Sequence, residues 1–88
     1  MAYKVSNTLT TTNGNTYANV DEWMRDHGPC GTQSPLVIDG SLTLLNNTTV
    51  RCVKVFANQA DHESLKASKV SQGRTIEYTV SDISKETI

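Results

Sequence analysis

The chain has 88 residues, of which 36% are hydrophobic and 19% are charged, and its formal net charge at pH 7 is −1. This length predicts a single domain over residues 1–88 that buries only about 60 to 65% of its unfolded surface. The near-zero charge argues against nucleic acid or an anionic membrane as an obligatory partner, because proteins that hold phosphates usually carry a basic surface. No apolar stretch approaches the roughly 20 residues of a bilayer-spanning helix, which argues against a membrane partner.

The first predicted element is a strand over residues 3–12. Tyr3, Val5 and Leu9 occupy its odd positions and polar residues occupy its even positions, which is typical of a strand with one buried face. Asn13-Gly14 favours a type I′ turn after it, and a short return segment, residues 15–17, then leads to the next element.

A short helix capped at both ends is predicted to follow, from Asn19 to Gly28. The Asn19 side chain is suited to accept a hydrogen bond from the first turn, and Glu22, three residues later, to bond back to the Asn19 amide. Gly28 and the proline after it end the helix. Its apolar stripe carries Trp23, the only tryptophan, and is expected to pack on a sheet.

A β-meander of three strands and two tight turns is predicted for residues 36–56. The first two strands, residues 36–38 and 41–45, are separated by Asp39-Gly40, and the third, residues 48–56, follows Asn46-Asn47. Each of these dipeptides is typical of a tight turn, so all three strands are expected to be antiparallel neighbours.

The third strand of this meander is apolar on both faces. Val50, Cys52 and Phe56 alternate with a second set of residues, Arg51, Val53 and Val55. Such a strand is either central and covered on both sides, or interrupted by a bulge near Cys52 that changes its register.

The remainder of the chain predicts a connector and a last strand. Residues 57–71 permit either one or two helical turns, capped by Asn58 or Asp61, or a mobile loop. Residues 74–83 alternate again, with Ile76, Tyr78 and Val80 predicted to point inward. Residues 84–88 are predicted to form a polar tail that need not be ordered.

Together these elements predict an α+β fold, an antiparallel sheet of four or five strands with one short helix packed on one face, in the order β-α-β-β-β-connector-β. Because one helix rarely covers so wide a sheet, the other face is expected to be exposed and mostly Thr and Ser. The exception lies around Val53 and Val55. The predicted interaction surface is Arg51, Val53 and Val55.

The cysteines and histidines do not form a convincing metal or catalytic motif. His27, Cys30, Cys52 and His62 lack the close pairing of a zinc site. A Cys30 nucleophile beside either histidine is weakly supported, because any glycine-containing loop offers amides for an oxyanion. We therefore expect no catalytic residue, no metal and no cofactor. The polar start of the chain lacks the apolar stretch of a secretory signal, so reduced thiols in a cytoplasmic protein are expected. A Cys30–Cys52 disulfide would require the loop of residues 28–35 to fold back on the meander.

The first functional hypothesis is a non-enzymatic protein-interaction domain that forms a homo-oligomer or binds another protein through its exposed sheet face or an edge strand. It is supported by the lack of a catalytic set, by a thin core that association would stabilise, and by the two-faced strand at Val53 and Val55. Small size and a richness in Thr and Asn suit an accessory protein of a mobile or viral genome.

The alternative hypothesis is a module that binds a small ligand, a nucleotide or nucleic acid through the 28–35 loop and the basic residues of the second half. A basic groove could form beside the open face, where Arg51 and an aromatic such as Tyr78 would meet a base or a phosphate. Solvated charges on a loop would explain the excess of basic residues in the second half of the chain equally well. The candidate ligand residues are His27, Cys30, Lys54, Lys66, Lys69 and Arg74.

Overall fold

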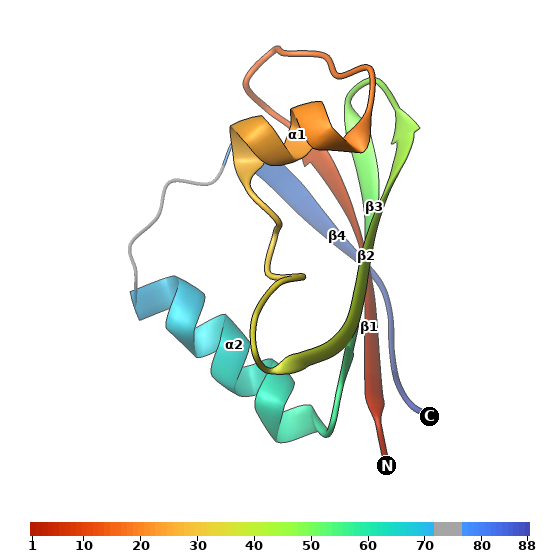
Figure 1. Cartoon of the computed structure of the whole chain (residues 1–88), viewed down its shortest axis with the longest axis vertical. Helices are drawn as coiled ribbons and strands as arrows, with labels where there is room; N and C mark the ends of the chain where they lie inside the picture. The colour runs from red at the N-terminus through yellow and green to blue at the C-terminus, as the bar shows by residue number, and fades with distance from the viewer. Residues whose placement is uncertain (72–76) are drawn as a thin grey trace.

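Four strands form one antiparallel sheet in the order β2-β3-β1-β4 in the computed structural model, which describes residues 1–71 and 77–88, without the side chains of residues 69–71 and 82. The strands are β1 (Tyr3–Thr11), β2 (Val37–Asn46), β3 (Thr49–Phe56) and β4 (Tyr78–Thr87). The helices, α1 (Val20–His27) and α2 (Gln59–Ser71), lie on the same side of the sheet (Figure 1). No helix of the described residues covers the other side.

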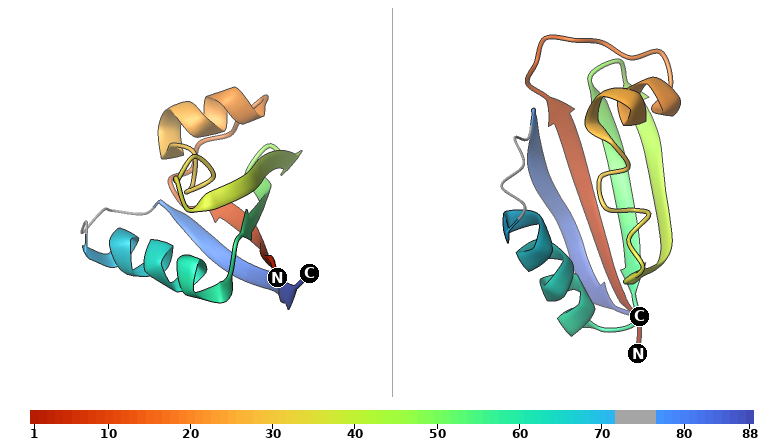
Figure 2. Two further views of the ribbon diagram at one scale, coloured as in Figure 1. Left: turned by 60° about the horizontal axis from the view of Figure 1, so that its bottom comes forward. Right: turned by 60° about the vertical axis from the view of Figure 1, so that its left-hand side comes forward.

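The element order β-α-β-β-α-β with this strand order is the split β-α-β, or ferredoxin-like, topology. The predicted α+β class, with an antiparallel sheet and a short helix packed on one face, is confirmed. Figure 2 shows α1 near one end of the strands and α2 near the other. Because such a topology hosts many unrelated functions, the function has to be argued from the surfaces and the side chains.

The predicted meander contains one strand too many. Residues 37–38 and 41–45 belong to the single strand β2, and Asp39-Gly40 lies inside it instead of forming a turn. The register against β3 shifts between Val37 and Asp39, and Ile38, which lies at this shift, is 63% exposed. A Cβ on Gly40 would lie 3.0 Å from the Thr32 carbonyl oxygen, so glycine here permits a close approach of the preceding loop.

Both predicted caps of α1 are present, with one change. The Asn19 side chain accepts a hydrogen bond from the Glu22 amide at 3.0 Å, but the Glu22 carboxylate accepts from the Ala18 amide, one residue earlier than predicted. Gly28 has a φ of 77° and donates its N–H to the Met24 carbonyl at 2.7 Å, which ends the helix.

The connector is a helix, and the predicted tail is a strand. Asn58 caps α2 by accepting from the Asp61 amide at 2.9 Å. β4 is described from Tyr78, and the predicted start of this strand, residues 74–76, lies outside the described residues. The last residues of the chain, predicted as a polar tail, pair with β1. Backbone pairing holds residues 84–87 of this edge strand without apolar side chains. Ile88 extends the contact by donating to the Ala2 carbonyl, and the predicted core residue Ile76 lies outside the described residues.

The helix side of the sheet carries two apolar clusters. One lies under α1 and comprises Leu9, Tyr17, Trp23, Cys30, Val50 and Cys52. The other lies under α2 and comprises Tyr3, Val5, Phe56 and Leu65. Asn7 separates the two clusters along β1 and Lys54 separates them along β3, and both side chains are buried at 8% exposure. The core is therefore divided by a buried polar row at the middle of the sheet.

Candidate functional site

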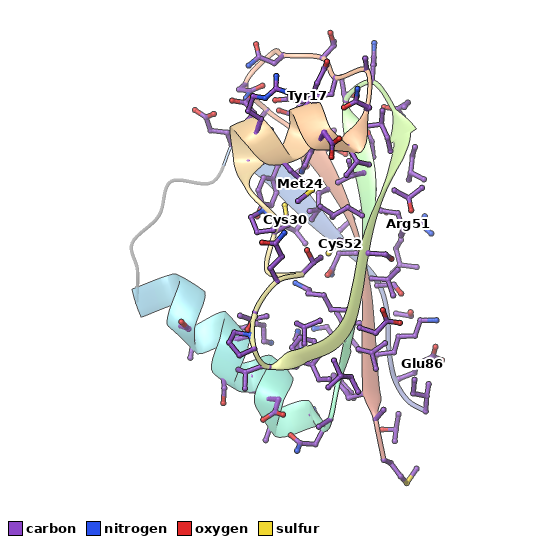
Figure 3. All side chains as sticks on the ribbon, viewed as in Figure 1. Tyr17, Met24, Cys30, Arg51, Cys52 and Glu86 are labelled. Atoms are coloured by element: carbon purple, nitrogen blue, oxygen red, sulfur yellow. The ribbon has the colours of Figure 1, made fainter. Side chains whose placement is uncertain are left out.

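The predicted interaction residues share the face that no described helix covers. Along β3, buried and half-buried residues alternate regularly, so Val50, Cys52, Lys54 and Phe56 point to the helix side and Arg51, Val53 and Val55 to the other. Figure 3 shows Arg51 and Glu86 on this second side. β3 is a central strand, between β2 and β1, as the first predicted explanation of the two-faced strand required. The predicted cover on both sides is wrong, because no helix of the described residues lies over its second face, and the alternative of a bulge near Cys52 is wrong, because the register shifts of β3 with β2 lie elsewhere. We call this second side the open face.

The open face is polar and built mostly of short side chains. Val53 pairs with Ser6 on β1 and Ser41 on β2, and Val55 pairs with Lys4 and Asp39. Hydroxyl side chains occupy most remaining positions: Thr8, Thr10, Thr43, Thr49, Thr79, Ser81 and Ser84. Both valines are half-buried among these short side chains. The two valines therefore form the apolar centre of a hydroxyl-rich surface.

No aromatic side chain of the chain lies on the open face. All of them belong to the helix side, where they pack in the clusters: Tyr3, Tyr17, Trp23, Phe56 and Tyr78. The predicted meeting of Arg51 with Tyr78 is therefore wrong, because strand alternation places these side chains on opposite faces. Without aromatic rings the open face lacks the stacking platform on which sheet proteins bind single-stranded nucleic acid.

A cavity of about 250 Å³ opens on the helix side of the sheet, where Cys30 of the loop before β2 and two residues of α2 line it together with residues of β1, β3 and β4. Its charged and polar lining comes from four segments: Lys54 of β3, His62 and Lys66 of α2, Lys85 of β4, and Asn7 of β1. The rest of the lining is Leu9, Cys30, Cys52, Tyr78 and Val80. We call this the basic cavity, because no carboxylate lines it among the side chains that the structure describes.

Lys54 is the most unusual residue of the basic cavity. Its side chain is 8% exposed, and its Nζ donates one hydrogen bond, at 3.3 Å, to the Cys30 carbonyl. Neither of the two ion pairs found in the described part of the chain includes it. A buried ammonium normally has an anionic partner, because burial removes its hydration. Lys66, by contrast, is half-exposed and pairs with Glu63 at 3.2 Å.

His62 forms the α2 wall of the basic cavity. Its ring packs against Phe56 at 5.2 Å and Tyr3 at 5.7 Å between centroids, and its Nδ1 is buried without a hydrogen bond. Desolvation lowers the pKa of His62 below 6.5, the positive charge of Lys66 lowers it further, and Glu63 raises it in part. His62 is therefore neutral at pH 7.

Acidification is expected to destabilise the protein through His62. Because its pKa is lowered in the folded state, the unfolded chain binds more protons from pH 6.5 down to the folded pKa, so this stability is complete above pH 6.5 and is lost across that window. Urea unfolding between about pH 7.5 and pH 5 measures the loss. In His62→Gln the slope should flatten, and an unchanged slope would refute the assignment. Asp26 acts in a lower window, since its hydrogen bond from Tyr17 lowers its pKa below 3.8.

His27, a predicted ligand residue, belongs to an aromatic cluster and not to the basic cavity. Its ring lies 4.4 Å from that of Trp23, and its Nε2 lies 3.0 Å from the Tyr17 hydroxyl and 3.3 Å from the Thr11 hydroxyl. Tyr17 also donates to the Asp26 carboxylate. Sequence patterning missed Tyr17, which precedes the helix and shows no periodicity, although it is buried and joins these groups.

The other predicted ligand residues are only partly brought together. Cys30, Lys54 and Lys66 line the basic cavity, whereas the side chain of Lys69 and the whole of Arg74 lie outside the described residues. The sequence-based set omitted His62 and Lys85. The signal for this site was two polar residues, Asn7 and Lys54, at core-facing positions of β1 and β3.

The buried Cys30 thiol contacts two groups close to it in the sequence. Its Sγ accepts a hydrogen bond from the Trp23 indole at 3.5 Å and contacts the Gly28 carbonyl at 3.7 Å. Cys30 and Cys52 are both buried free thiols. In the described part of the chain, no three His, Cys, Asp or Glu side chains are grouped so that they could hold a metal ion.

Comparison of the chain with models of protein families, with curated proteins and with solved structures found no significant match. Neither helix of the described residues has the length and apolar character needed to span a bilayer.

Proposed function

We propose that this protein is a non-enzymatic interaction domain that pairs with a second copy of itself through the open face. The supporting observation is the asymmetry of the sheet, in which both helices and every aromatic side chain lie on one side and Val53 and Val55 are left on the other. Burial of these valines against a second copy would add apolar contact to a domain whose own core is thin.

The charges of the open face support a like partner. Lys4 and Arg51 are positive, while Asp39 and Glu86 are negative, and the register places Lys4 between Val55 and Glu86. A two-fold interface brings the same surface of both subunits together, so it requires a face that does not repel itself. A face with both signs of charge meets this requirement.

The size of the open face predicts a weak dimer. Strands of about nine residues at about 3.3 Å per residue, spaced about 4.8 Å apart, give a four-stranded face of about 30 by 19 Å. Two such faces would bury about 1,100 Å² in total, at the lower end of specific interfaces. Association is therefore expected to depend on concentration.

Sedimentation velocity from micromolar to millimolar concentration tests this proposal. The wild-type protein should shift from monomer to dimer, and Val53→Lys should stay monomeric, because a buried unpaired ammonium opposes the interface. Ser64→Lys makes the same charge change on an exposed position of α2 and should leave the dimer intact. A wild-type monomer at every concentration would refute the proposal. A dimer that survives Val53→Lys would refute the open face in favour of an edge strand.

Two further expectations stay predictions that rest on the sequence. These are a cytoplasmic location and an accessory role in a mobile or viral genome. Neither changes the dimerisation experiment.

A further inference from the structure

We propose that the basic cavity binds a small oxyanion, a phosphate group either free or as the monoester of a small molecule. This site lies on the side of the sheet opposite the open face and is independent of self-association. The inference starts from Lys54, whose burial requires compensation that the described residues do not supply in full.

The hydrogen bonds of Lys54 leave capacity for a ligand. An ammonium carries three N–H donors, and the Cys30 carbonyl accepts one bond. That carbonyl is neutral, so it does not balance the charge, and neither ion pair of the described residues involves Lys54. A phosphate oxygen in the cavity would provide the missing anionic partner and accept charge-assisted hydrogen bonds, which are about twice as strong as neutral ones.

Further positive charge surrounds the same space. Lys66 and Lys85 line it from α2 and β4, and both also have contacts of their own, so Lys54 is the central ligand residue in this proposal. Desolvation is the main cause of the lowered pKa of His62, and the charges of Lys66, Lys85 and Lys54 lower it further while Glu63 opposes them in part, which shows that all three lysines lie near this ring. Neutral His62 and the Asn7 amide are polar groups that do not oppose an anion.

The shape of the basic cavity limits the ligand to a small one. Its volume of about 250 Å³ lies below the roughly 300 to 1,000 Å³ of pockets for drug-sized ligands. Leu9, Tyr78 and Val80 form an apolar part of the lining beside the cations. This combination suits a phosphate group joined to a small apolar group. A nucleic-acid strand does not fit, because it needs a groove that follows several phosphates.

NMR titration of the folded full chain with inorganic phosphate and with phenyl phosphate, at constant ionic strength, tests the site. Amide shifts should move at Asn7, Lys54 and His62 and saturate. Tighter binding of phenyl phosphate would identify a monoester as the ligand, and equal binding would identify free phosphate. Chloride at the same ionic strength should move none of these signals. The absence of saturable shifts, or the same shifts with chloride, would overturn the proposal.

Lys54→Met removes the ammonium and keeps a long apolar side chain. It should weaken phosphate binding about tenfold or more, because a hydrogen bond to a charged group contributes about 1.5 to 3 kcal/mol. Lys4→Met removes a cation from the open face and should change the affinity less than about twofold, since an exposed distant charge is screened by salt. Equal affinities of the two variants would overturn the proposal.

Thermal unfolding provides a second readout if Lys54→Met alters the fold. Phosphate that binds only the folded state raises the melting temperature of the wild-type protein. Lys66→Met leaves Lys54 in place and should retain part of this increase, while Lys54→Met should lose it. A phosphate-induced increase that is the same in all three proteins would refute binding in the basic cavity.

Discussion

Replacing Trp23 with alanine is expected to lower the free energy of unfolding by about 3 to 5 kcal/mol. The side chain is completely buried and packs against the rings of Tyr17, His27 and Tyr78, at 5.3, 4.4 and 6.1 Å between centroids. Its indole N–H also bonds to Cys30, which ties the 28–36 loop to α1. Domains of this length have a total stability of about 4 to 13 kcal/mol at 0.05 to 0.15 kcal/mol per residue.

Thermal unfolding followed by circular dichroism measures this loss. The melting temperature of Trp23→Ala should fall by about 12 °C or more, because 1 kcal/mol corresponds to about 4 to 8 °C in a domain of this size. Trp23→Phe is the matched control, since it keeps a ring in the same space and removes the hydrogen bond to Cys30. It should lose less than half as much stability. A fall below about 4 °C in Trp23→Ala would show that α1 contributes little to the fold.

Local patterns in the sequence were sufficient for the parts of the fold that depend on near neighbours. Alternation along β1 and β3 correctly assigned Val5, Leu9 and Phe56 to the buried face, because side chains of a strand alternate whatever its partners are. The caps of α1 were also predictable, since Asn19 and Gly28 act within one helical turn.

Long-range contacts explain the parts of the fold that were wrong. Gly40 was interpreted as a turn residue, but its lack of a side chain allows the close approach of Thr32, on a loop whose position the sequence did not predict. The length of β4 depends on backbone bonds to β1, which leave no pattern in side chains. Val80 was predicted to be buried, yet it is 53% exposed beside the basic cavity.

The two candidate sites also differ in whether local sequence patterns or long-range contacts determine them. The open face followed from alternation in a single strand, so Arg51, Val53 and Val55 could be named in advance. The basic cavity joins Lys54, His62 and Lys85 from three separate elements, and only the tertiary fold brings them together. The sequence pointed to this cavity only through polar residues at positions of β1 and β3 that alternation assigns to the buried face. A search for hydrophobic patterns does not find them.

Phe56→Ala is expected to detach α2 from the sheet. Phe56 is completely buried in the cluster that contains Tyr3, Val5 and Leu65, and its removal should cost about 3 to 5 kcal/mol. Among the described side chains of α2, only His62 and Leu65 are buried. Burial of a leucine contributes about 1.5 to 3 kcal/mol, so the loss exceeds what Leu65 provides to hold the helix.

Limited proteolysis and circular dichroism together measure this detachment. Phe56→Ala should lose helical signal and become sensitive to cleavage after Lys66, an exposed residue in the middle of α2. Phe56→Leu retains most of the apolar volume and should keep the helix docked, with a loss below about 1.5 kcal/mol. Protection of Lys66 in Phe56→Ala would contradict the proposed role of this side chain.

The fluorescence of Trp23 distinguishes detachment of α2 from unfolding of the whole domain. The cluster around Trp23 and the cluster around Phe56 share no residue, and the polar row of Asn7 and Lys54 lies between them. Loss of one cluster should therefore leave the other folded, and Phe56→Ala should keep the emission of a buried tryptophan after α2 has become cleavable. If emission and helical signal instead changed together in a single transition, the two clusters would be one cooperative unit, coupled across the polar row.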